Sequence, residues 1–221
     1  MKVAGTVFQH RSPPCSARDL ETRSKQRIVY SEIDVKHWSA RRPSCAAARP
    51  ARCPSCAAES REPGRALRVV GHGLRERMIE GPPVPGVVPT AVSVITRRYR
   101  CRACSAVIVV APRGVARAFR YAVTAIAWAL ALWAYERMPA ASVRARTSTA
   151  KWVGAAGATR WLSLPRWTQC ADRLFGFSPS GAEMVRQHAA RIATFVSAHA
   201  PVQTGMVSHD AFFGAAFCQP P

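Results

Sequence analysis

The sequence is poor in acidic residues. Its 221 residues include 12 Asp and Glu against 32 Lys and Arg, which gives a formal net charge of +20. A surplus of this size favours a polyanionic partner, either nucleic acid or an anionic membrane surface. An Arg-rich genome would raise the Arg content evenly, but residues 81–171 carry thirteen basic residues and one acidic residue, Glu136. Such a concentration is typical of a nucleic-acid-binding surface.

The scarcity of carboxylates also argues against several classes of enzyme. A transposase needs carboxylates that hold two metal ions near the scissile phosphate, and Glu136 is the sole carboxylate in residues 81–171. The carboxylates that follow, Asp172, Glu183 and Asp210, do not lie at recognisable strand ends. P-loop, HExxH and Ser/His/Asp patterns are absent as well. We therefore expect a protein that is not an enzyme.

Long apolar segments are missing too. The one membrane candidate, the uncharged and mostly apolar stretch Tyr121–Tyr135, has 15 residues, whereas a membrane-spanning helix needs about 20. The run predicts a buried helix and no membrane partner. The first residues lack the continuous apolar core of a secretory signal. We expect a cytoplasmic protein, located at the nucleoid.

Four of the eight cysteines form two Cys-x-x-Cys pairs, Cys53/Cys56 and Cys101/Cys104. In a reducing compartment such pairs are more often metal ligands than disulfides. Two knuckles of this kind complete a tetrahedral shell of four thiolates, which leaves no position for a substrate and predicts a structural Zn²⁺. A redox-active pair is the alternative, but it requires a βαβ pattern that neither pair has.

Cys45 is a weaker candidate ligand, and His72, between two glycines, is another. The remaining cysteines are expected to be bystanders: Cys15, Cys170 and Cys218. A Zn²⁺ ion with four thiolates carries a net charge of −2, and three flanking arginines would compensate it: Arg52, Arg100 and Arg102.

The segment between the two pairs alternates β-branched runs with turn residues. It predicts strands that fold back and bring the knuckles together. The expected elements are a strand over Ala66–Val70, a turn at Gly71-His72-Gly73, strands over Leu74–Ile79 and Ala91–Arg100 separated by a loop over Gly81–Pro89, and a strand over Ala106–Val110.

Beyond residue 113 the pattern becomes helical. Apolar residues at spacings of three and four predict a helix over residues 119–135, with aromatic residues on its opposite face. A helix that is apolar all round is either buried or packed against partners on several sides, so this helix is also a possible protein-binding element. Further helices are predicted over Ser142–Val153, Trp161–Leu174 and Ser178–His199.

The predicted fold is α+β, with a small antiparallel zinc ribbon followed by an α-helical region that resembles a helix-turn-helix. We expect a basic, weakly ordered N-terminal arm over residues 1–50, with a short strand over Arg27–Val35. The ribbon would occupy residues 51–112, the helical region residues 113–200 and a tail residues 201–221. The oligomeric state is left open.

The order of motifs resembles that of transposon-associated bacterial zinc-ribbon proteins. In these proteins a CPxC, GHG and R-R-[YF]-x-C-x-x-C ribbon precedes a helix-turn-helix region. The matching motifs here are Cys53-Pro-Ser-Cys56, Gly71-His72-Gly73, Arg97-Arg98-Tyr99-Arg100-Cys101-Arg102-Ala103-Cys104, Tyr121 and the Trp161/Leu164/Trp167 segment. The resemblance covers roughly residues 50–170 and implies DNA binding linked to insertion sequences. The expected helix-turn-helix segment, residues 140–157, departs from the family in having few bulky anchors.

Two groups of basic residues are candidates for contacts with nucleic acid, and we expect double-stranded DNA. The first forms a ridge beside the second knuckle: Arg97, Arg98, Arg100 and Arg102. The second is interleaved with Trp152, Trp161 and Trp167: Arg144, Arg146, Lys151, Arg160 and Arg166. Three interpretations stay open at this point. The chain is a non-catalytic DNA-binding protein of a mobile element, a truncated transposase fragment, or an adaptor module with a structural zinc.

Overall fold

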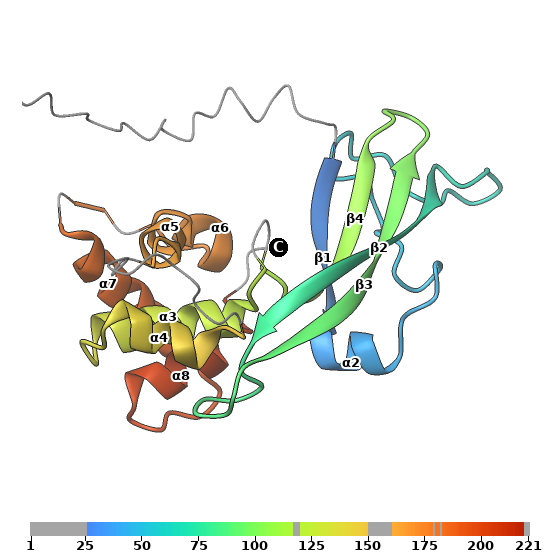
Figure 1. Cartoon of the computed structure of the whole chain (residues 1–221). Coiled ribbons are helices and arrows are strands. Elements are labelled where there is room, and N and C mark those ends of the chain that lie inside the picture. The colour runs from blue at the N-terminus through green and yellow to red at the C-terminus, as the bar shows by residue number, and fades with distance from the viewer. Residues whose placement is uncertain (1–25, 117–119, 150–160, 179, 182, 219–221) are drawn as a thin grey trace, which may run out of the picture.

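The computed structural model describes residues 26–218, except 117–119, 150–160, 179 and 182. It has the predicted α+β class, with a four-stranded sheet and α2 on one side and the remaining helices on the other (Figure 1). The strands are β1 (Gln26–Asp34), β2 (Val69–Gly81), β3 (Thr90–Cys101) and β4 (Val107–Arg113). The helices in the described ranges are α2 (Val35–Ala40), α3 (Val123–Ala134), α4 (Ala140–Thr147), α5 (Ser163–Gln169), α6 (Ala171–Phe175), α7 (Val185–Ser197) and α8 (Val207–Gly214).

The sheet has the strand order β1-β4-β3-β2 and is mixed. The strands β2, β3 and β4 pair antiparallel, as predicted, whereas β1 lies parallel to β4 along its edge. The predicted strand over Arg27–Val35 is confirmed as β1. The expectation of a weakly ordered arm is wrong for residues 26–50, because β1 and α2 are integral parts of the sheet's core.

The predicted turn at Gly71-His72-Gly73 is wrong, because β2 continues through it. The pairing of β2 with β3 shifts register between Gly71 and Leu74, which makes the glycines part of a bulge. Gly73 has φ of 101°, which glycine adopts readily. A Cβ at Gly71 would lie 2.8 Å from the Sγ atom of Cys45, so this position needs glycine for close approach. The hairpin instead turns at residues 82–89.

Residues 35–48 cover the sheet face that carries Tyr99. The indole Nε1 of Trp38, on α2, donates to the carbonyl of Ile95 at 2.8 Å. The Tyr99 hydroxyl donates to the carbonyl of Cys45 at 2.9 Å. Both aromatic side chains are fully buried, so this face is the sheet's hydrophobic core.

Ten of the twelve residues of α3 are buried. A helix without a polar face needs cover on every side, and α4, α5, α7 and α8 pack around it. The predicted buried helix is thus confirmed, and its apolar surface is covered within the chain rather than left open for a partner. Among the described helices, none combines the length and apolar character that crossing a membrane requires.

The later helices differ from the prediction in their bounds. The helix over 161–174 divides into α5 and α6 at Cys170, with Pro165 in the first turn of α5. The helix expected to begin at Ser178 begins at Val185. The predicted tail over 201–221 contains α8, which packs on α3 and α7. With only eight residues, α8 is too short for its apolar residues to show a repeating helical spacing in the sequence.

The end of β2 joins the sheet to the helices. The backbone N–H of Glu80 donates to the carbonyl of Arg120, and its own carbonyl accepts from the N–H of Ala122, both at 2.9 Å. The next residue, Gly81, has φ of 150°. A Cβ there would lie 2.6 Å from the Cβ of Ala125 on α3. Glycine therefore allows the strand to touch the helix.

Gly81→Ala should destabilise the protein by about 2–3 kcal/mol, because it adds a steric clash to a strained backbone conformation. Gly86→Ala is the matched control: its φ is 83°, but no atom lies within 4 Å of the added Cβ. That variant should lose only about 1 kcal/mol. Denaturant unfolding of both variants measures the difference, and equal losses would contradict the close contact with α3.

Candidate functional site

The four predicted cysteine ligands meet at one end of the sheet. Cys53 and Cys56 lie in the loop before β2, while Cys101 ends β3 and Cys104 lies in the turn before β4. All four Sγ atoms lie within 4.8 Å of one another. The Sγ atoms of Cys53 and Cys104 are 3.7 Å apart, and those of Cys56 and Cys101 are 3.8 Å apart.

These distances fit a tetrahedral metal site. With Zn–S bonds of about 2.3 Å, the sulfur atoms of a tetrahedron lie about 3.8 Å apart. The four thiols therefore have the spacing to hold one metal ion of this size. Within the part of the chain that the structure describes, no other group of three or more His, Cys, Asp or Glu side chains converges in this way.

Each pair forms a knuckle with the same backbone geometry. In the first, the N–H of Cys53 donates to the carbonyl of Ala58, and the N–H of Ala57 donates to the carbonyl of Cys53, both at 2.9 Å. Ala57 has φ of 57°, which turns the chain back beneath the sulfurs. The second knuckle repeats both bonds at 2.9 Å and has φ of 60° at Ser105, through Cys101, Ser105 and Ala106.

The pairing of β2 with β3 brings the knuckles together. Val69, the first residue of β2, lies opposite Cys101, the last residue of β3. The backbone N–H of Arg102 then donates to the carbonyl of Arg68 at 2.8 Å, just beyond the strands. The long insert between the two pairs is thus a single hairpin whose base closes at the sulfur atoms, as the predicted fold-back of the insert requires.

The site is open to solvent on one side. Cys53 and Cys101 are buried, whereas Cys104 is half-buried and Cys56 is exposed. Burial by itself raises the pKa of the Cys101 thiol, but hydrogen bonds from the N–H groups of Cys104 and Ala103 and from the thiols of Cys104 and Cys53 outweigh this effect and lower the pKa to about 7. The pKa of the Cys56 and Cys104 thiols is raised instead, because burial and the neighbouring sulfur atoms outweigh the backbone N–H groups there. Of these three thiols, Cys101 is therefore the one that most readily forms the thiolate that a metal ion needs.

The weaker candidate ligands lie outside the four-sulfur group. The Sγ of Cys45 faces Gly71 on β2, and His72 lies in the bulge of that strand. Arg52 pairs with Glu59 at 3.2 Å, so its charge is shared with this carboxylate. Cys170 and Cys218 belong to the helical part, and Cys15 lies outside the described residues.

The arginines of the predicted ridge divide between the two faces of the sheet. Arg98 and Arg100 share one face, as their spacing predicts. Arg97 points to the other face, where its Nε donates to the carbonyl of Pro43 at 2.5 Å. Arg102 is exposed beside the second knuckle.

Two further arginines belong to the face of Arg98 and Arg100. The register pairs Arg75 with Thr96 and Arg77 with Val94, which places both β2 arginines on that face. Arg75 is exposed, and a guanidinium N–H of Arg77 donates to the carbonyl of Ala116 at 3.1 Å. The two-residue spacing of Arg75 and Arg77 is visible in the sequence. The turn that we predicted at Gly71–Gly73 is wrong, however, and the sequence therefore did not show which residues of β3 lie opposite them.

The second predicted group lies on the helical part. Arg146 on α4 and Arg166 on α5 are exposed, and Arg144 is half-buried. Lys151, Trp152 and Arg160 lie outside the described residues. Trp167 is buried, as predicted, and Trp161 packs edge-on against it with ring centroids 4.9 Å apart. Both rings are therefore part of the helical core.

A buried carboxylate was missed by the sequence analysis. The side chain of Glu80 is 1% exposed and forms an ion pair with Arg120 at 3.1 Å. Burial raises its pKa, but hydrogen bonds from Thr149 and Ser148 and the charge of Arg120 outweigh burial and lower the pKa below its ordinary value. The stability that this carboxylate contributes is present at neutral pH and is lost as the pH falls through the lowered pKa.

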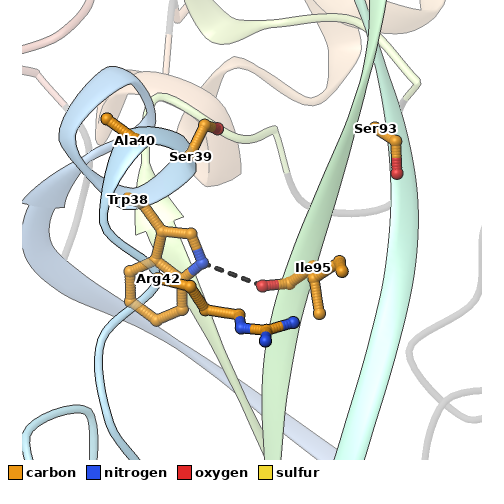
Figure 2. Close-up of a pocket in the computed structure, with 6 residues that line it drawn as sticks. All are labelled: Trp38, Ser39, Ala40, Arg42, Ser93 and Ile95. Atoms are coloured by element: carbon orange, nitrogen blue, oxygen red, sulfur yellow. Dashed lines mark hydrogen bonds between the residues drawn. The ribbon is translucent and has the colours of Figure 1, made fainter.

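A pocket lies between α2 and β3 (Figure 2). It is lined by Trp38, Ser39, Ala40, Arg42, Ser93 and Ile95. Arg42 is the charged residue among them. Neither a carboxylate nor a histidine is among these lining residues, so the pocket does not supply the groups needed for general acid–base chemistry.

We predict that the purified protein contains about one metal ion per chain and that Cys101→Ser loses both the ion and the folded sheet. The reason is that three ligands cannot close the tetrahedral shell. Cys45→Ser is the control and should retain the ion. Elemental analysis and circular dichroism measure both effects, and a well-folded Cys101→Ser protein that retains its metal would contradict the site.

Comparison with known proteins gave no match among family models, curated proteins or solved structures. Similarity therefore assigns neither a family nor an activity to the chain. The features that point to a function are the geometry of the four sulfur atoms and the placement of the arginines.

Proposed function

We propose that the chain is a non-catalytic DNA-binding protein of a mobile element, stabilised by a structural Zn²⁺ bound to Cys53, Cys56, Cys101 and Cys104. The observation that carries this proposal is the convergence of four sulfur atoms at tetrahedral spacing on a basic sheet. Four protein ligands fill the coordination shell of zinc, so the ion would hold the knuckles and the ends of the hairpin rather than activate a substrate.

The distribution of cations supports nucleic acid as the partner. Arg75, Arg98 and Arg100 share one face of the sheet, and the backbone is held there by the β2–β3 pairing. Guanidinium groups on a rigid strand can contact successive phosphates without reading base identity. The link with mobile elements comes from the motif order of the ribbon, and the proposed location is the nucleoid.

The helical part would supply a second contact surface. In a helix-turn-helix-like arrangement, α4 is the candidate for the element that faces DNA. Val143 and Thr147 of α4 face the core, whereas Arg146 points to solvent. Burial of α3 on all sides favours this role for the helical part over that of an adaptor binding a partner through residues 119–135.

Arg98→Ala and Arg100→Ala should each weaken duplex DNA binding about three- to tenfold, similarly for different sequences. Each should also reduce the slope of log K against log salt by about 1, because one phosphate contact is lost. Fluorescence anisotropy with two unrelated 20-bp duplexes over a salt series measures both effects.

Arg173→Ala, on α6, is the matched control, because it removes one exposed positive charge from a part of the chain with balanced charge. It should leave the affinity and the salt slope almost unchanged. If the three variants behave alike, binding reflects net charge and the proposed arginine surface is wrong. If the wild-type protein binds no duplex, the proposed function fails.

A further inference from the structure

The carboxylate of Glu80 connects two parts of the chain that are far apart in sequence. Its Oε1 accepts hydrogen bonds from the hydroxyl of Ser148 at 2.9 Å and the hydroxyl of Thr149 at 2.6 Å, and also from the backbone N–H of Thr149. The hydroxyl of Tyr121 donates to the Ser148 Oγ at 3.1 Å. With Arg120 on Oε2, both oxygens of the carboxylate are engaged.

This concentration of donors compensates the burial of a charge. A carboxylate removed from water is costly unless hydrogen bonds and an opposite charge replace its hydration. Glu80 lies at the end of β2, whereas Ser148 and Thr149 directly follow α4. The network therefore joins the sheet to the end of a helix, in addition to the backbone bonds that Glu80 makes with Arg120 and Ala122.

The buried face of helix α4 is small. The helix has eight residues, of which only Val143 and Thr147 are buried. A short helix with so small an apolar face depends on tertiary contacts for its position. The polar contacts of Ser148 and Thr149 with Glu80 begin directly after its last residue, and Arg146 projects to solvent one turn or less before them.

We propose that Glu80 is a positioning residue for nucleic-acid binding: it clamps the end of α4 to β2 and thereby fixes Arg146 relative to the arginines of the sheet. The inference rests on the proposed function. Two cationic surfaces held in a fixed arrangement bind one polyanion more tightly than two that move independently, because less freedom is lost on binding.

The direction in which one substitution changes the affinity for DNA tests this role. Glu80→Gln removes a negative charge, so charge alone predicts tighter DNA binding. A broken clamp predicts weaker binding, by about threefold or more. Glu76→Gln on the same strand is the matched control: Glu76 is exposed, accepts from the Ser93 hydroxyl at 2.5 Å and carries the same charge. It should bind DNA as tightly as the wild type or more tightly.

A double-mutant cycle with Arg146→Ala separates positioning from a general loss of structure. Arg146→Ala should weaken binding in the wild-type background and have much less effect in Glu80→Gln, while the metal content stays at the wild-type level. Ser148→Ala, which leaves the charge unchanged, should weaken binding in the same direction and serves if Glu80→Gln does not fold. Equal or tighter binding by Glu80→Gln, or additive effects of the two substitutions, would overturn the proposal.

Hydrogen exchange distinguishes failure of the clamp from failure of the proposed function. The backbone amide of Thr149 should exchange faster in Glu80→Gln than in Glu76→Gln, whether or not the protein binds DNA. Unchanged protection of this amide refutes the clamp. A wild-type protein that binds no duplex, but whose Thr149 amide loses protection in Glu80→Gln, refutes the DNA-binding function and the role of Arg146 while leaving the clamp as a structural contact.

Discussion

The convergence of four sulfur atoms at the base of the β2–β3 hairpin is the constraint on which the sheet depends. Two knuckles with the same backbone hydrogen bonds face each other there, and Val69 and Cys101 start the strand pairing directly beside them. The sheet has a modest core, built largely around Trp38 and Tyr99. A structural zinc ion can supply on the order of 10 kcal/mol to folding, which is large compared with the net stability of a small domain.

The sequence predicts those features that depend on local spacing. The Cys-x-x-Cys spacing predicts both knuckles, the β-branched run at Val92–Thr96 predicts β3, and the apolar residues after Val123 predict a buried helix. The sequence does not predict those features that are determined by contacts between residues far apart in the chain. Gly71 and Gly73 resemble a hairpin turn, yet Gly71 makes room for Cys45 and Gly73 forms a bulge within one strand. The parallel pairing of β1 with β4 and the packing of α8 leave no local pattern that could reveal them.

The few carboxylates determine which cations remain available to a partner. Glu59 pairs with Arg52, Glu62 with Arg68, and Glu80 with Arg120. The sequence shows a broad positive surplus but not its distribution between internal contacts and the surface. The alternation of side chains along β3 further divides the arginines between the two faces of the sheet, because Arg97 is directed toward Pro43 while Arg98 lies on the opposite face. The basic surface is therefore smaller and better defined than the net charge of +20 suggests.

The separation of the two knuckles along the chain also constrains the order in which the molecule assembles. During synthesis Cys53 and Cys56 leave the ribosome well before Cys101 and Cys104, so for that interval an ion can find only two of its four ligands. Complete coordination has to wait until both strands of the hairpin have emerged and paired. Capture of the proposed metal ion would thus be a late event that closes a long loop, and the thiols of Cys53 and Cys56 would have to stay reduced until Cys101 and Cys104 have emerged.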